Sequence, residues 1–165
     1  MNAEMQRIET GWNELVELVN QVQAAGGLTR VGSDGWSVKD HLAHIGAWEH
    51  SLLALIEGRD RLAGMGVQEP VDEITDAVNE AVRKVHENDT ADEALEYFRD
   101  SHAQLVAALG KLSDADLQKP YNHYQLGDPD QKRPVVDWVG GNTYEHYAEH
   151  IAWINQLLSE SSAAR

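Results

Sequence analysis

The sequence predicts an all-α protein: a four-helix bundle with a short additional helix and a long loop before the last helix. Apolar side chains recur at alternating steps of three and four residues over four long segments, which is the period of one helix face. No segment shows the alternating pattern of a β-strand. The 165 residues suit a single domain, residues 1–165, that is long enough to bury a core.

The first two predicted helices have recognisable ends. The first covers residues 3–24, and Gly26 follows it as a C-terminal cap would. Its apolar stripe consists of Met5, Ile8, Trp12, Leu15, Val19 and Val22. Ser37 opens the second helix, and Asp40 resembles the second half of a capping box, with Asp in place of Glu. Gly58 stops this helix. Its stripe consists of Val38, Ile45, Trp48, Leu52 and Leu55, with His41 in phase.

The middle of the chain predicts a linker, a weaker helix and the third long helix. Residues 58–70 hold three glycines and a proline and predict a linker. Residues 71–87 predict the additional helix, with apolar positions at Ile74, Val78, Ala81, Val82 and Val85. Thr90 with Glu93 predicts a capping box that starts the next helix. Its stripe consists of Leu95, Phe98, His102, Leu105, Leu109 and Leu112, and residues 113–117 predict one short turn.

A long loop and the last helix complete the bundle. Residues 118–133 have no period and contain two prolines, and a loop of this length is usually functional or mobile. Pro134 fits the first position of a helix. Gly140 and Gly141 interrupt its first turns, which indicates a close neighbour or a bend. Its stripe consists of Val139, Thr143, His146, His150, Trp153 and Leu157.

Composition excludes several classes of function. The net charge of −15 disfavours binding to nucleic acids and to anionic membrane surfaces, because like charges repel. The absence of cysteine excludes disulfides, thiolate nucleophiles and cysteine-based metal sites. No stretch has the roughly 20 apolar residues of a membrane span. The first residues do not resemble a secretory signal, so we expect a cytoplasmic protein.

The histidines are the chemically informative residues. His146 and His150 lie four apart in a predicted helix, so both rings share one face and could reach one cation. His41 and His44 on the second helix are candidates for a third ligand if that helix packs beside the last one. Three histidines would leave coordination positions open, as catalytic sites do. The alternative is that these rings are hydrogen-bonded residues of the core.

Other residues are candidates for the surroundings of the site. Trp48 and Trp153 each lie within one turn of a candidate ligand, so we expect them to line an apolar pocket. Trp12 and Trp36 are interpreted as core anchors. His102 is either a satisfied core residue or a base near the pocket.

Two segments resemble the DinB/YfiT-like superfamily. Residues 36–44 read WSVKDHLAH, which is similar to the second-helix signature in which a His eight residues after the Trp is a metal ligand. His146-Tyr-Ala-Glu-His150 is similar to the last-helix motif of that family. The resemblance implies a four-helix bundle, often a homodimer, with a divalent metal that is most often zinc or nickel. It implies His44, His146 and His150 as the metal ligands, and so prefers His44 to His41.

A closer resemblance is to the ClbS/DfsB-like branch, whose best-understood activity is self-protection by hydrolysis of an electrophilic toxin. The similar segments are the one at Trp36, residues 119–122 and residues 137–147. The best-understood member of this branch has a tyrosine at the position of His44. The resemblance therefore implies a shared fold more than a shared reaction.

The leading hypothesis is a metal-dependent enzyme that acts on a small molecule. It would hydrolyse an electrophilic substrate or transfer a low-molecular-weight thiol. Glu49, His102 and Tyr144 are the candidate acid–base or orienting groups. Tyr121, from the long loop, joins Trp48 and Trp153 as a candidate pocket residue. The alternatives are a protein that sequesters a toxic small molecule without turnover, and a bundle in which the histidines only bond to one another.

Overall fold

The computed structural model describes residues 3–68 and 75–163, and within them it is helical and contains no strand. The prediction of an all-α fold is therefore confirmed. The helices are α1 (Ala3–Ala24), α2 (Val38–Ile56), α3 (Arg61–Gly64), α4 (Thr75–His86), α5 (Ala91–Leu109), α6 (Asp114–Leu117), α7 (Tyr121–Tyr124), α8 (Val136–Asn142) and α9 (Tyr144–Ala163). No helix in this part of the chain is long and apolar enough to cross a bilayer.

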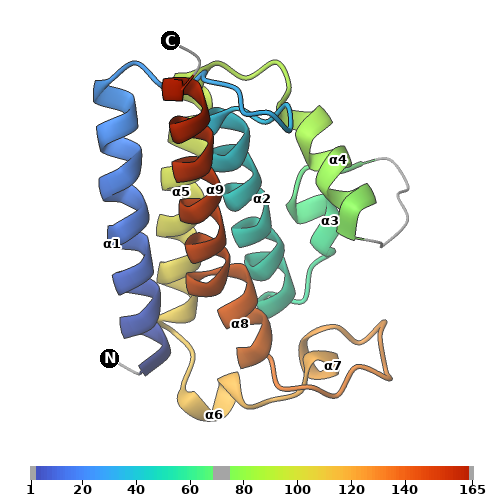
Figure 1. Ribbon diagram of the computed structural model, residues 1–165. Helices are drawn as coiled ribbons and strands as arrows, with labels where there is room; N and C mark the ends of the chain where they lie inside the picture. The colour runs from blue at the N-terminus through green and yellow to red at the C-terminus, as the bar shows by residue number, and fades with distance from the viewer. Residues whose placement is uncertain (1–2, 69–74, 164–165) are drawn as a thin grey trace.

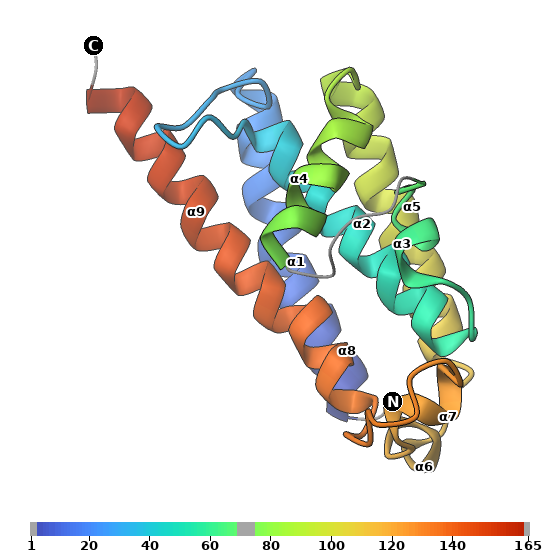
Figure 2. The same ribbon diagram turned by 90° about the vertical axis from the view of Figure 1, so that its right-hand side faces the viewer.

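Four long rods form the bundle, as Figures 1 and 2 show: α1, α2, α5 and the rod made of α8 followed by α9. α2 packs most extensively against α5, and α1 packs against α9. The short helices α3 and α4 lie against the outer side of α2, away from α1. α6 and α7 lie at the end of the bundle where α8 begins.

α2 is the central helix of the fold, because it contacts α3, α4, α5, α8 and α9. Its inner residues, among them Leu42, Ile45 and Leu52, are fully buried. A second, smaller apolar cluster joins α2 to α4 through Ala47 and Val82. A side chain on α2 therefore faces either the main core, the α4 cluster or the space left between α4 and α9.

The predicted starts at Ser37 and Thr90 and the predicted stop at Gly58 are confirmed, whereas the last rod begins at Val136 and not at Pro134, which pairs with Pro120 in an isolated bridge. Ser37 and Thr90 each form a capping box, with Asp40 and Glu93 as the respective partners. Gly58 stops α2 with φ of 68°, a conformation that glycine adopts without steric cost. These caps fix where α2 begins, and so fix the height at which its histidines lie in the bundle.

Two segments predicted as loops contain short helices. The predicted linker 58–70 includes α3, which the side chain of Asp60 caps by accepting a hydrogen bond from the Ala63 N–H. The predicted loop 118–133 includes α7. Its two ends are tied by the hydrogen bond from Tyr121 N to the Arg133 carbonyl, 2.8 Å long. The weaker predicted helix 71–87 is α4, and residues 71–74 lie outside the described residues.

The predicted last helix is two helices separated by a break at Thr143. Thr143 has φ −129° and ψ −110°, and its hydroxyl donates to the Val139 carbonyl. A Cβ at Gly140 would lie 2.6 Å from the Tyr144 hydroxyl oxygen. The prediction of a close neighbour at Gly140 is thus confirmed.

Candidate metal centre

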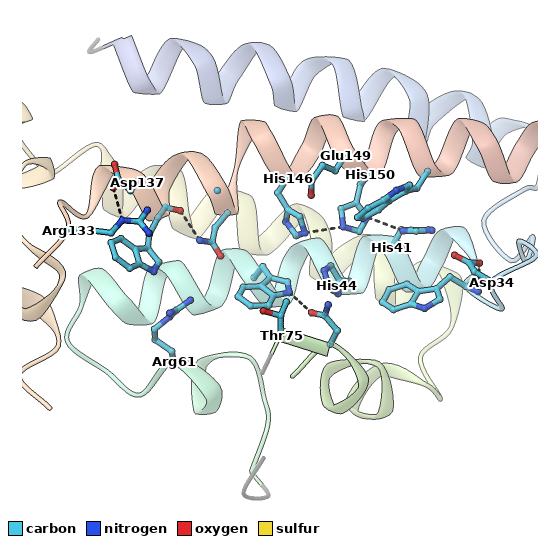
Figure 3. A pocket seen from close by; sticks show the side chains of 17 residues that line it. Asp34, His41, His44, Arg61, Thr75, Arg133, Asp137, His146, Glu149 and His150 are labelled. Atoms are coloured by element: carbon cyan, nitrogen blue, oxygen red, sulfur yellow. Dashed lines mark hydrogen bonds and ion pairs between the residues drawn. The ribbon is translucent and has the colours of Figure 1, made fainter. Parts of the chain in front are cut away.

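Three histidine rings from two helices meet between α2 and α9. His44 comes from α2, and His146 and His150 come from α9. Each ring offers one nitrogen, and these nitrogens all lie within 4.8 Å of one another. Figure 3 shows the three rings grouped in the middle of the pocket wall. The structure thus brings together the three residues that the family resemblance implies as ligands.

A chain of imidazoles connects the group. Nε2 of His150 lies 3.0 Å from Nε2 of His146. Nδ1 of His150 lies 2.9 Å from Nδ1 of His41, which is also on α2. Two nitrogens bonded to one ion at about 2.1 Å lie roughly 3 to 3.5 Å apart, so the His146–His150 spacing suits a shared ion. If Nε2 of His150 binds a metal, its proton is on Nδ1, and His41 accepts that proton in a hydrogen bond.

Burial keeps the cluster uncharged. It lowers the pKa of His44 to about 3 and the pKa of His146 to about 4, with neighbouring histidines as a smaller cause. The pKa of His150 is held well below its usual value for the same reasons. Neutral imidazole is the form that binds metals, so no proton needs to leave these rings near pH 7.

The polar atoms of the cluster are not fully satisfied within the chain. Nδ1 of His44 and Nδ1 of His146 are buried and have no hydrogen-bond partner among residues 3–68 and 75–163. A buried nitrogen without a partner costs free energy. A cation is therefore indicated by the convergence of three neutral rings and by the His146–His150 spacing, because an ion bound at Nε2 of His146 would not bond its Nδ1 atom.

A pocket of about 720 Å³ opens in front of the three histidines. Indole rings form much of its wall: Trp36, Trp48, Trp138 and Trp153. Trp48 and Trp153 both line the cavity, and Trp153 is 48% exposed at its rim. Trp36, which the sequence pattern indicates as a core anchor, instead lines the pocket. Its ring centroid lies 5.4 Å from that of His44. A pocket of this size holds a small organic molecule.

Tyr121 does not line this pocket. Its ring is buried in the main core and lies 4.7 Å from the ring of Trp138, measured between centroids. It therefore supports the wall from behind. Of the three predicted pocket residues, the structure brings Trp48 and Trp153 to the cavity and leaves Tyr121 outside it.

Glu49 and His102 form a separate buried cluster on the core side of α2. Glu49 is fully buried and accepts hydrogen bonds from the hydroxyls of Ser101 (2.6 Å) and Tyr147. Nδ1 of His102 lies 3.0 Å from the same carboxylate, and the His102 ring stacks on Trp12 at 3.6 Å. Neither Glu49 nor His102 lines the pocket. The cluster ties α1, α2, α5 and α9 together rather than facing a substrate.

Tyr144 lies apart from both clusters. Its hydroxyl donates to Glu4 Oε2 at 3.0 Å, and the guanidinium of Arg7 lies 3.9 Å from the centre of its ring. These contacts join α1 to the start of α9. Tyr144 therefore does not approach the three histidines.

Tyr147 was missed by the sequence analysis, although a signal for it exists. A stripe through Thr143, Tyr147, His150, Ile154 and Leu157 has the same helical period as the predicted one, and all five are buried. His146 and Trp153 lie on the flank of this stripe and face the pocket. The helix thus has two inward faces, one toward the core and one toward the cavity.

Comparisons with known proteins point to a family. The family model described as the DinB superfamily matches residues 7–154 of the chain. The comparisons with curated proteins and with solved structures gave no significant match. The match extends from α1 to α9 and includes all three histidines.

Proposed function

Because this chain belongs to the DinB superfamily, we propose that His44, His146 and His150 bind a divalent metal ion and that the pocket in front of them binds a small-molecule substrate. Zinc and nickel are the preferred candidates, since imidazole suits both. The observation that carries the proposal is the convergence of three neutral imidazoles on the wall of an accessible pocket.

An ion bound by three protein ligands has positions left for other molecules, and it supplies a nucleophile at neutral pH by acidifying a water or a thiol. The chain's own residues provide the surroundings. With Nε2 of His150 on the metal, His41 would accept the Nδ1 proton of His150 and so fix that ring. The indole N–H of Trp48 donates to Asn79 Oδ1 at 3.2 Å, which fixes one wall of the pocket. The indole rings exclude water from the substrate.

The proposed reaction is attack on an electrophilic carbon of the substrate, by water in a hydrolase or by a thiol in a transferase. The chain contains no cysteine, so a thiol nucleophile would come from a low-molecular-weight cosubstrate. The ClbS/DfsB-like resemblance supports the hydrolytic version and a role in self-protection. Association into a homodimer remains a prediction from the family resemblance.

Metal content tests the proposal. Protein purified without chelators is expected to carry about one divalent ion per chain, as measured by plasma mass spectrometry. The double variant His146→Ala/His150→Ala should lose the metal. His123→Ala is the matched control, because His123 is exposed on α7 and lies outside the pocket. Wild type that stays metal-free after incubation with zinc and with nickel would contradict the proposal.

The indole-lined cavity supports a second candidate, sequestration of a reactive small molecule without turnover. The two candidates differ in stoichiometry. A sequestering protein consumes at most one equivalent of an electrophile, whereas an enzyme continues beyond it. Product measured against protein concentration, with metal-loaded wild type, decides between them.

A further inference from the structure

The pocket has a different charge at each of its two ends. Arg61 and Arg133 lie at one end, the three histidines are in the middle, and Asp34 lies beyond His41 at the other end (Figure 3). The two arginines are in different states. Arg133 Nε lies 3.1 Å from Asp137 Oδ2, so its charge is already balanced by a carboxylate. Of these two arginines, Arg61 is the one without a carboxylate partner in the part of the chain that the structure describes.

Arg61 is held in place by uncharged groups. Its Nε donates to the hydroxyl of Ser51 at 3.0 Å, and Ser51 is only 1% exposed. Its guanidinium carbon lies 6.0 Å from the centre of the Tyr121 ring. No carboxylate oxygen of the described residues lies within 4.0 Å of its nitrogens, although the chain has 28 acidic side chains. Among the described residues, both terminal amino groups of Arg61 therefore lack a charged partner.

We propose that Arg61 binds a carboxylate of the substrate, so that the substrate is an organic acid whose anionic end lies at the α3 end of the pocket. A guanidinium fork matches a carboxylate with two parallel hydrogen bonds. Asp34 at the opposite end and Glu149 beside the histidines both repel the same group, which leaves the Arg61 end as the favoured place for an anion. The proposal deepens the proposed function, since it assumes that the reacting carbon lies near the three histidines.

A pair of ligands that differ only in charge tests the assignment. We suggest 1-naphthylacetate and 1-naphthylacetamide, which have the same shape, with binding followed by quenching of the tryptophan fluorescence. Wild type is expected to bind the acetate about 10-fold more tightly than the amide, a difference typical of a charge-assisted pair. Arg61→Gln should bind both ligands equally, and Arg61→Lys should keep part of the preference. Arg59→Gln is the matched control, because Arg59 is exposed, pairs with Glu57 and lies outside the pocket.

Equal affinity of wild type for the two ligands, or no binding of either in the millimolar range, would overturn the proposal. A preference for the acetate that persists in Arg61→Gln would also overturn it, provided that thermal unfolding shows this variant to be folded.

Each titration is run on protein as purified and again after chelation. A preference that disappears on chelation but not in Arg61→Gln would place the carboxylate on the metal, which refutes the role of Arg61 and supports the metal centre. A preference that survives chelation and needs Arg61 supports the assignment even if the metal test fails.

Discussion

The Nδ1 atoms of His41 and His150 lie 2.9 Å apart in the interior, although 109 residues separate them in the chain. The contact joins α2 to α9 next to the three convergent histidines. It leaves Nε2 of His150 facing His146. If Nε2 of His150 binds a metal, Nδ1 of His150 carries the proton and His41 accepts it, so His41 would act on the metal through His150.

Replacing His41 with phenylalanine is expected to weaken metal binding about 10-fold, because the His150 ring loses its acceptor. His41→Asn should retain more affinity, since the amide oxygen of Asn occupies nearly the position of Nδ1. Competition with a chromogenic chelator measures both variants. His123→Phe serves as a control of equal chemistry at an exposed site. Equal affinities in wild type and His41→Phe would show that the contact does not support the metal centre.

Glu49→Ala is expected to lower the free energy of unfolding by about 3 kcal/mol or more. The substitution leaves Ser101, His102 and Tyr147 without the carboxylate that they share. Glu49→Gln should cost less, since it keeps the size of the side chain and one acceptor. Urea unfolding followed by circular dichroism gives the values. Glu17→Ala, on the exposed face of α1, should change stability by no more than about 0.5 kcal/mol.

The same pair of variants shows whether the Glu49 cluster affects stability alone or also the metal centre. Glu49 does not line the pocket, so at a temperature where the variants are folded their metal content should equal that of wild type. Loss of metal from folded Glu49→Gln would show instead that the cluster holds α2 and α9 in the register that the histidines need.

The long helices were predictable because their signals are local. A capping box at Ser37, a glycine at position 58 and a regular apolar stripe are readable without knowing any tertiary contact. The short helix α3 was not, since its four residues are too few to show a period. The break at Thr143 depends on how Tyr144 packs against Gly140, a contact that only the folded chain defines.

The three histidines were predictable for a different reason. Spacing placed His146 and His150 on one face, but it left His41 and His44 equivalent as partners, and only the resemblance distinguished them. In the structure both are buried on α2 and both contact His150. Arg61 had no signal at all, because its importance comes from the absence of a charged partner, and a sequence does not show which charges are paired.

Gly46 and Gly141 make a matched pair for a packing prediction. A Cβ at Gly46 would lie 2.8 Å from two ring carbons of Tyr97, whereas a Cβ at Gly141 would meet nothing within 4 Å. Alanine gains up to about 1 kcal/mol over glycine inside a helix, and overpacking costs about 1 to 3 kcal/mol. Gly46→Ala should therefore be destabilising and Gly141→Ala neutral or stabilising. The denaturant concentration at the midpoint of unfolding measures both changes in stability, if the variants and wild type unfold with the same dependence on denaturant. A Gly46→Ala variant as stable as wild type would mean that the Tyr97 ring moves aside freely.

Acid should destabilise the metal-free protein already in the pH range above that in which carboxylates take up protons. The pKa values of His44 and His146 are lowered to about 3 and about 4, while an unfolded chain has histidines near 6.5. Between these limits the unfolded state binds more protons than the native state, so the free energy of unfolding falls as pH drops from about 6.5 to about 4. Above pH 7 both states are neutral at these rings, and the effect vanishes. Urea unfolding of chelated protein across this range measures the slope.

His146→Gln is the variant that isolates the effect, because it removes one titrating ring and keeps a polar atom near the position of Nε2. Its stability should fall less steeply than that of wild type between about pH 6.5 and pH 4. His123→Gln should leave the slope unchanged, since His123 is exposed. Parallel slopes for wild type and His146→Gln would mean that His146 takes up a proton as easily in the folded protein as in the unfolded chain, and that burial does not keep this ring neutral.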